Sequence, residues 1–283
     1  MEPSFTFALP TGSVELRACA RSETGSVRAV NEDSFVAEPP VFIVADGMGG
    51  HERGDRASQT IARVLRERLV TDRLPTSADV IEAISAANTA VRALVSETGQ
   101  PLVSGSTLSG VVLVGDDAGT ATHWMTVNVG DSRLYTWNGR VLEQLTVDHS
   151  AVQELVDAGV ITEAAARVHP ERNVITRAVG AADRIEPDIW LLPVLSDETF
   201  LVCSDGLTKE LDDATIAAVL ASHGDDHSVA QQLVDAANAA GGQDNITAIV
   251  VGATLVGRGS DVDSTLDRLA ELVDTVTTPR IGA

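Results

Sequence analysis

The sequence predicts an α+β protein with antiparallel sheets, and two patterns carry this prediction. Apolar residues recur at helical spacing over 54–72 and 77–97, which is typical of amphipathic helices of roughly five turns. Apolar runs between residues 107 and 146 are separated by turn residues such as Asn138-Gly139, which indicates antiparallel strands. With 283 residues, 44% of them apolar, the chain can form one large domain or two modest ones around a substantial core.

The other elements are expected from short apolar runs and helical spacing, with glycines at several of their ends. In chain order they are a buried strand that stops at Asp46-Gly47, a helix over 150–158, strands over 189–194 and 199–204, helices over about 212–221 and 227–240, and a last strand over 246–252.

The charge of the chain excludes several classes of partner. A formal net charge of −21 repels the phosphates of nucleic acids and anionic lipids and favours metal cations. No apolar stretch approaches the roughly 20 residues of a membrane span, and no signal peptide is visible. The two cysteines, Cys19 and Cys203, indicate no disulfide framework, which fits a cytoplasmic protein.

Four aspartates share a position relative to the predicted strands. Taken singly, Asp46, Asp131, Asp205 and Asp244 are better explained as turn residues than as ligands. Each, however, adjoins an apolar run suited to a central strand, so neighbouring strand ends can bring the carboxylates together. Converging carboxylates repel one another, and a hard divalent cation relieves that repulsion. Without His/Cys clusters of zinc spacing, the sequence indicates Mg²⁺ or Mn²⁺, with room for more than one ion.

Two further segments add candidate site residues. Arg28 offers a planar fork of donors that suits a phosphate, and Glu32 and Asp33 add two acids, although a salt bridge in an exposed turn explains this segment equally well. The glycines at 46–50 lack the GK[ST] of a Walker phosphate loop. They allow close backbone approach instead, so the Gly47 carbonyl is a candidate metal ligand.

The motifs RAVNED, VADGMGGH, GSTL, VGDSRLY, TVDHS, NVITRAVG, LVCSDGL and GGQDNIT occur in this order over about residues 14–252. This series resembles the metal-dependent Ser/Thr protein phosphatases, the protein phosphatase 2C-like or PPM family, in its bacterial form. The resemblance implies a four-layer α/β/β/α sandwich of two antiparallel sheets. It also implies a catalytic domain over 1–253, with a variable flap over about 148–176 beside the metal cleft.

The resemblance implies two to three Mn²⁺ or Mg²⁺ ions and assigns ligands to them. Asp46 would bridge two ions, and the Gly47 carbonyl would bind the second. Asp205 and Asp244 would complete the first site. Asp131, helped by Asp205, would hold a third ion of the kind that bacterial relatives often bind.

The remaining implied roles concern the second ion, the substrate and the reaction. Glu32 and Asp33 would hold the second ion directly or through water, and Arg28 would orient the substrate phosphate. A metal-activated water would attack phosphorus in line, without a phosphoenzyme. Eukaryotic relatives carry a histidine directly after Asp-Gly, proposed as the general acid, but this position is Met48 here, so the general acid is not identified.

The expected function is hydrolysis of phosphoserine and phosphothreonine in signalling proteins, by a monomer that counteracts a Ser/Thr kinase. One alternative is a phosphoprotein-binding signalling module with weak or lost turnover. Another is a phosphatase specialised for regulators of sigma factors. Residues 254–283 form a tail in which Val262, Leu266 and Leu269 begin one helical face. This helix would either dock on the domain or bind a partner.

Overall fold

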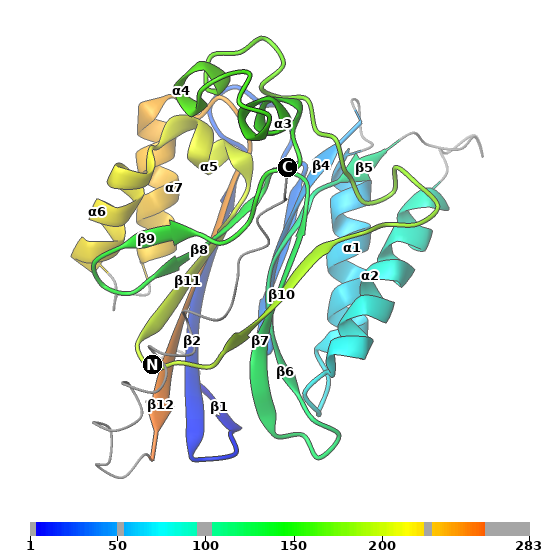
Figure 1. The fold of residues 1–283 in the computed structure, drawn as a ribbon, viewed down its shortest axis with the longest axis vertical. Coiled ribbons are helices and arrows are strands. Elements are labelled where there is room, and N and C mark those ends of the chain that lie inside the picture. Colours follow the sequence, from blue (N-terminus) through cyan, green and yellow to red (C-terminus); the bar gives the residue numbers. More distant parts are fainter. Residues whose placement is uncertain (1–3, 50–53, 95–103, 224–227, 258–283) are drawn as a thin grey trace.

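The computed structural model describes residues 4–49, 54–94, 104–223 and 228–257. Two antiparallel sheets pack face to face, and helices cover both outer faces (Figure 1). The predicted four-layer α/β/β/α sandwich is confirmed. No helix among the described residues is long and apolar enough to cross a membrane.

The first sheet has six strands in the order β1-β2-β12-β11-β8-β9. The Asn138-Gly139 hairpin joins β8 to β9 as predicted, and Gly139 has a φ of +86°. The strands are β1 (Phe5–Ala8), β2 (Ser13–Glu23), β8 (Arg133–Trp137), β9 (Leu142–Gln144), β11 (Glu198–Cys203) and β12 (Ile246–Val256).

The second sheet runs in the order β10-β7-β6-β4-β3, and the short β5 pairs with the end of β4. Every residue of β6 is buried, which explains its uninterrupted apolar and small-residue sequence. The strands are β3 (Asp33–Glu38), β4 (Val41–Met48), β5 (Gly105–Ser106), β6 (Leu108–Gly115), β7 (Ala121–Val129) and β10 (Asp188–Pro193).

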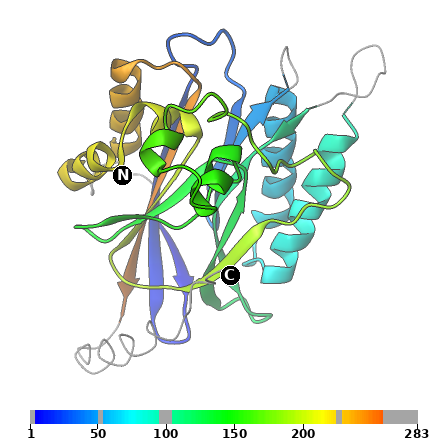
Figure 2. The ribbon, with the colours of Figure 1, turned by 45° about the horizontal axis from the view of Figure 1, so that its top comes forward.

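The helices fall into three groups. Two cover the second sheet, three cover the first, and two short ones lie across the top of the molecule, within the flap of residues 148–176 (Figure 2). In that order they are α1 (Gly54–Leu69) and α2 (Ser77–Arg92), then α5 (Asp205–Glu210), α6 (Asp213–His223) and α7 (Val229–Ala240), and finally α3 (Ala151–Asp157) and α4 (Glu163–Ala166).

Three apolar layers hold the sandwich together: one under each helical layer and one between the sheets. The middle layer contains three of the four largest fully buried side chains, Trp124, Phe42 and Phe200. The Trp124 ring lies 5.3 Å from the Phe200 ring and 6.5 Å from the Phe42 ring, measured between centroids. These aromatic contacts join the two sheets, because Trp124 and Phe42 belong to the second sheet and Phe200 to the first.

Element ends differ from the predictions in several places. The helices predicted over 54–72 and 77–97 end at Leu69 and Arg92, and β12 continues to Val256, past its predicted end at residue 252. The short elements β1, β5, α4 and α5 were not predicted, because so few residues show no clear periodicity. The predicted tail helix lies outside the described residues.

Antiparallel pairing brings five strand ends to one place, at the top of Figure 1. The carboxyl ends of β4, β7 and β11 meet the amino ends of β3 and β12 there, because neighbouring antiparallel strands run in opposite directions. The site described below is built on these ends, underneath α3 and α4.

A glycine in the centre of the second sheet tests this packing. A Cβ at Gly110 would lie 2.2 Å from the Phe42 carbonyl oxygen and 2.7 Å from the Ile43 Cα. Gly110→Ala should therefore push β6 away from β4 and lower the free energy of unfolding by about 1–3 kcal/mol in chemical denaturation. Gly252→Ala is the matched control, since its Cβ would meet only the Arg17 carbonyl oxygen, at 4.0 Å. Equal effects of the two substitutions would contradict this account.

Candidate metal centre

Asp33 and Asp46 stand opposite each other in the β3–β4 ladder. Oδ2 of Asp33 accepts hydrogen bonds from the hydroxyls of Ser204 at 2.8 Å and Thr247 at 2.7 Å. Both donors belong to the ends of the first sheet, so Asp33 joins the two sheets at the site. Its other oxygen, Oδ1, is buried without a hydrogen-bond partner.

Asp131 is placed by the turn that follows β7. Gly130 has a φ of +102°, and a Cβ there would lie 2.6 Å from Cγ2 of Thr107, so glycine is required on both counts. The Thr107 hydroxyl accepts a hydrogen bond from the Asp46 amide at 2.9 Å and lies 2.7 Å from the Ser132 hydroxyl. Thr107 thus fixes the backbone at Asp46 and next to Asp131 together.

Asp205 begins α5 directly after β11, and Asp244 lies just before β12. The ammonium of Lys209 lies 2.5 Å from Oδ2 of Asp205 and 3.1 Å from Oδ2 of Asp244. Arg28 forms a two-pronged contact with Asp244, from Nε to Oδ1 and from a terminal nitrogen to Oδ2, both at 2.9 Å. The two carboxylates predicted for the first metal site are therefore each paired with a cation.

The other carboxylates of the site are protonated more readily than usual. Burial raises the pKa of Asp33 to about 7 and that of Asp131 to about 8, and the negative charge of Asp205 adds to both shifts. Burial, followed by the charges of the neighbouring aspartates, raises the pKa of Asp46 well above its ordinary range. Burial also raises the pKa of Asp205, against the opposing effect of Lys209.

Asp244 differs from its neighbours. Burial raises its pKa, but Lys209, the Asn245 amide and Arg28 together outweigh burial and hold the pKa below its usual value. Asp244 therefore favours its charged form, whereas burial and mutual repulsion favour the protonated form of the other aspartates.

The donor set fits hard divalent cations. Asp33, Asp131 and Asp205 each retain a buried Oδ1 without a hydrogen-bond partner, and such an oxygen is costly unless a cation or donor satisfies it. All the donors are oxygens, which suit Mg²⁺ and Mn²⁺. Within the described ranges, no three His, Cys, Asp or Glu side chains already stand as a closed ligand set.

The backbone of Gly47 is enclosed by Glu32 and Gly54. The Gly47 amide donates to the Glu32 carbonyl oxygen at 3.1 Å, and a Cβ at Gly47 would lie 2.1 Å from the Gly54 carbonyl oxygen. A Cβ at Gly54 would in turn lie 2.6 Å from Oε1 of Glu32, so the Glu32 carboxylate reaches the start of α1. Any residue larger than glycine at position 47 would force α1 to move.

Sequence reasoning missed several residues that position the predicted ones. Asn245 accepts the Glu32 amide and donates to the Thr24 and Val30 carbonyl oxygens, each at 2.9 Å, so it fixes the loop that carries Arg28. The sequence feature that could have identified Asn245 is its position directly after Asp244 in the motif GGQDNIT. Thr107, Ser204 and Thr247 were also missed, because their partners are distant in sequence. Lys209 was missed although its partner Asp205 is only four residues away.

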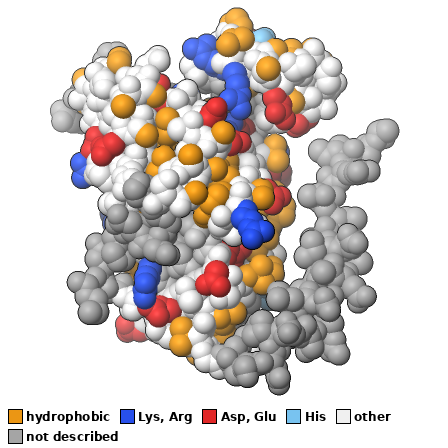
Figure 3. Space-filling view, turned by 90° about the vertical axis from the view of Figure 1, so that its left-hand side faces the viewer, with side chains coloured by type: hydrophobic (Ala, Val, Ile, Leu, Met, Phe, Trp, Pro, Cys, Tyr) orange, Lys and Arg blue, Asp and Glu red, His pale blue; other side chains and the backbone are white. Residues whose placement is uncertain are grey.

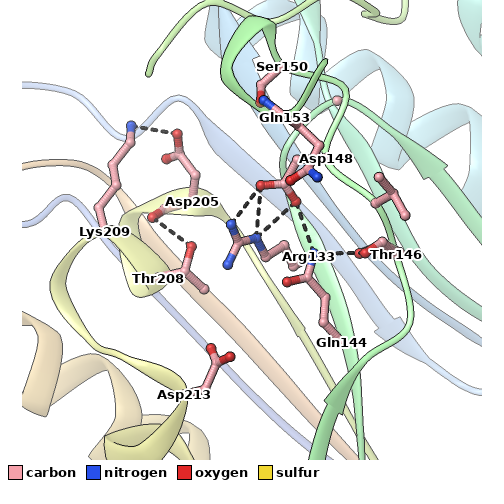
Figure 4. Close-up of polar contacts among 12 residues, drawn as sticks. Arg133, Gln144, Thr146, Asp148, Ser150, Gln153, Asp205, Thr208, Lys209 and Asp213 are labelled. Atoms are coloured by element: carbon pink, nitrogen blue, oxygen red, sulfur yellow. Dashed lines mark hydrogen bonds and ion pairs between the residues drawn. The ribbon is translucent and has the colours of Figure 1, made fainter. Parts of the chain in front are cut away.

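A cleft of about 600 Å³ opens beside the aspartates, between the flap and α5. Figure 4 shows Lys209 and Asp205 near the ion pair of Arg133 and Asp148, whose shortest nitrogen–oxygen distance is 2.7 Å. Basic and acidic side chains stand next to one another at the top of the face that carries α6 and α7, and hydrophobic ones gather lower down (Figure 3). The cleft is therefore polar and of mixed charge.

The base of the flap is fixed to the sheets by His149. Its Nδ1 accepts the Gly130 amide at 3.1 Å, so the position before Asp131 is tied to the flap. Its Nε2 lies 3.1 Å from Asp188 of β10, and Arg177 contacts the same carboxylate at 2.8 Å. His149 near the start of the predicted flap and Arg177 just after its end thus contact one carboxylate.

A family model described as protein phosphatase 2C matches residues 26–250. The chain belongs to the protein phosphatase 2C family. It is similar to the serine/threonine phosphatase stp of Listeria monocytogenes, with 34% identity over 257 residues that cover 85% of this chain and 97% of the relative.

Two solved phosphatase structures share the fold. One is the PPM Ser-Thr phosphatase MsPP from Mycobacterium smegmatis in complex with cacodylate, with a TM-score of 0.74 and 36% identity, covering 83% of this chain and 97% of that one. The other is the catalytic domain of the phosphatase PstP in complex with two manganese ions, with a TM-score of 0.75 and 34% identity. The match covers 85% of this chain and 99% of that one. The family predicted from the motif order is confirmed.

The raised pKa values predict how the stability of the metal-free protein depends on pH. A carboxyl whose pKa is higher in the folded than in the unfolded protein favours folding at low pH, and this contribution is lost as pH rises through the folded pKa. With folded values of about 7 for Asp33 and about 8 for Asp131, the free energy of unfolding should fall between about pH 4 and about pH 8. Denaturant titrations in EDTA at several pH values measure this.

Asp131→Asn is the matched variant, because it removes one of the titrating groups and keeps the size of the side chain. Its stability should fall less steeply with pH than that of the wild type. A wild-type stability that rises across this range, or equal slopes for the two proteins, would show that the buried carboxyls do not titrate as described.

Proposed function

We propose that this chain hydrolyses phosphoserine and phosphothreonine in proteins, using two or three Mn²⁺ or Mg²⁺ ions. The observation that carries the proposal is the convergence of Asp33, Asp46, Asp131, Asp205 and Asp244 at one end of the sandwich, with three buried carboxylate oxygens lacking a partner. Similarity to phosphatases over most of the chain supports the same activity.

The proposed ligands follow the positions of the aspartates. Asp46 would bridge two ions, Asp205 and Asp244 would complete the first site, and the Gly47 carbonyl would serve the second. Bound ions would supply a water of lowered pKa and would neutralise charge on the phosphoryl oxygens. Asp131 would hold a third ion together with Asp205, in keeping with its buried, unpaired Oδ1.

Two further residues are candidate ligands of the second ion, directly or through water, and their surroundings differ. Asp33 already uses Oδ2 for two hydroxyl donors, so only its Oδ1 is available to the second ion or to a water on it. Glu32 reaches the start of α1 close to Gly47, which suits it to hold the same ion through water.

Arg28 is the proposed phosphate ligand. It projects from the loop fixed by Asn245, lines the cleft and is half exposed, so its guanidinium can turn from Asp244 to a substrate. A planar fork of donors matches two phosphoryl oxygens. Cys203 has no part in the reaction, because it is fully buried and burial raises the pKa of its thiol to about 12.

The proposed substrates are phosphorylated proteins of the cytoplasm, and the phosphatase would counteract a Ser/Thr kinase there. Cys19 and Cys203 form no disulfide with each other, and a reducing compartment is compatible with this. The flap lines one wall of the cleft and would contact the polypeptide around the phosphorylated residue. The monomeric state stays a prediction from the sequence.

The second candidate function is a phosphoprotein-binding signalling module that has lost turnover. The ion pairs of Asp205 and Asp244 with Lys209 and Arg28 are the feature that favours it, since they engage the first-site carboxylates. A phosphatase specialised for regulators of sigma factors would use the same chemistry on a narrower set of substrates.

Release of phosphate from a phosphothreonine peptide with Mn²⁺ tests the proposal. Asp46→Asn should lower kcat/KM by about 10³-fold or more, because a bridging carboxylate holds both ions. Asp117→Asn removes one charge from an exposed turn away from the site and is the matched control, with unchanged kcat/KM. Full activity of Asp46→Asn would overturn the metal-bridge assignment, and tight peptide binding without turnover by the wild type would favour the signalling module.

A further inference from the structure

Lys209 is the only lysine in the sequence, which otherwise carries nineteen arginines. Every other cationic position except the histidines is therefore an arginine. The single lysine lies in α5, four residues after Asp205, and its ammonium points toward the Asp205 carboxylate (Figure 4).

The ammonium of Lys209 occupies the space between two proposed ligands of the first ion. It lies 2.5 Å from Asp205 and 3.1 Å from Asp244, and the three side chains retain 34%, 13% and 19% of their exposure respectively. Both distances join nitrogen to a carboxylate oxygen. An ion held between Asp205 and Asp244 would compete with the ammonium for the space between the two carboxylates.

The chemistry of lysine suits this place better than that of arginine. An ammonium is a compact point charge with three donors on a flexible stem, whereas a guanidinium is planar and pairs with carboxylates through a fixed fork. A compact charge fits between two carboxylates from different elements. The flexible stem also allows the charge to withdraw along the cleft, which Lys209 lines.

We propose that Lys209 occupies the first metal site of the unloaded protein and is displaced from it when a divalent cation binds. The side chain thereby competes with the metal. It keeps Asp205 and Asp244 neutralised in the absence of ions and lowers the affinity of the site for them. This inference rests on the metal centre of the proposed function and adds to it a residue that sets metal affinity.

Competition makes two linked effects necessary. Contacts that Lys209 makes only in the unloaded protein must be broken before the ion binds, so they stabilise the metal-free fold and weaken metal binding together. Loss of Lys209 should therefore destabilise the protein in EDTA and tighten its binding of Mn²⁺. A lysine that merely supported α5 would affect the stability of the loaded and unloaded protein alike.

The test compares Lys209→Gln with Arg140→Gln in the full chain. Arg140 follows the β8–β9 turn, is exposed and lies away from the cleft, so its substitution changes the net charge by the same amount. Calorimetric titration with Mn²⁺ should show the tightest binding step strengthened about tenfold in Lys209→Gln and unchanged in Arg140→Gln. Thermal unfolding in EDTA should show a lower Tm for Lys209→Gln alone.

A second measurement uses the wild-type chain and therefore does not depend on a variant that folds. Reductive methylation with ¹³C-formaldehyde labels one lysine and the terminal amine, and the dimethylated lysine keeps its charge. Titration with Mg²⁺ should shift the lysine ¹³C resonance to the position of a solvated amine, in step with the calorimetric saturation. The N-terminal signal serves as the internal reference.

Two results would overturn the inference: Mn²⁺ affinity in Lys209→Gln equal to or weaker than in the wild type, or a lysine resonance that stays unchanged while Mg²⁺ binds. Neither readout requires phosphate release. A protein that binds Mn²⁺, displaces Lys209 and hydrolyses no phosphopeptide would contradict the proposed function and leave this inference standing.

Discussion

Repulsion among the carboxylates at one end of the sandwich is the constraint on which the rest of the site depends. Five aspartates meet there in surroundings that exclude much of the water, and the pKa of four of them lies above its ordinary value, chiefly because of burial. Such a cluster is stable only when protons, basic side chains or metal ions supply positive charge. The structure shows the basic side chains Arg28 and Lys209, and the raised pKa values favour protons on the other carboxylates. The family to which the chain belongs points to metal ions.

The scaffold is what forces the carboxylates together. The aromatic contacts of Trp124 with Phe42 and Phe200 hold the two sheets against each other, and Asp33 joins them again at the site through Ser204 and Thr247. Strand ends of both sheets therefore converge at a fixed separation. Much of the energy that offsets the crowded charges comes from apolar burial lower in the sandwich, since hydrophobic packing is the dominant favourable term in folding.

Positioning residues give the site a defined resting arrangement. The Thr107 hydroxyl links the Asp46 amide to the Ser132 hydroxyl, Asn245 fixes the loop of Arg28, and His149 ties residues 148–176 to Gly130. Arg28 and Lys209, by contrast, have long, partly exposed side chains that line the cleft. The frame holds the carboxylates, and the two cations are the parts able to move when an ion or a phosphate enters.

The sequence by itself determined the fold class, the family and the identity of the acidic residues, because apolar periodicity and motif order are local properties that single stretches of chain display. Asp46, Asp131, Asp205 and Asp244 could be identified in this way from the strand-like runs beside them. Only the tertiary structure decided which of these carboxylates are neutralised and by what. The pairing of Lys209 with Asp244 and of Arg28 with Asp244 joins residues far apart in the chain, and such contacts exist only after the sheets have packed.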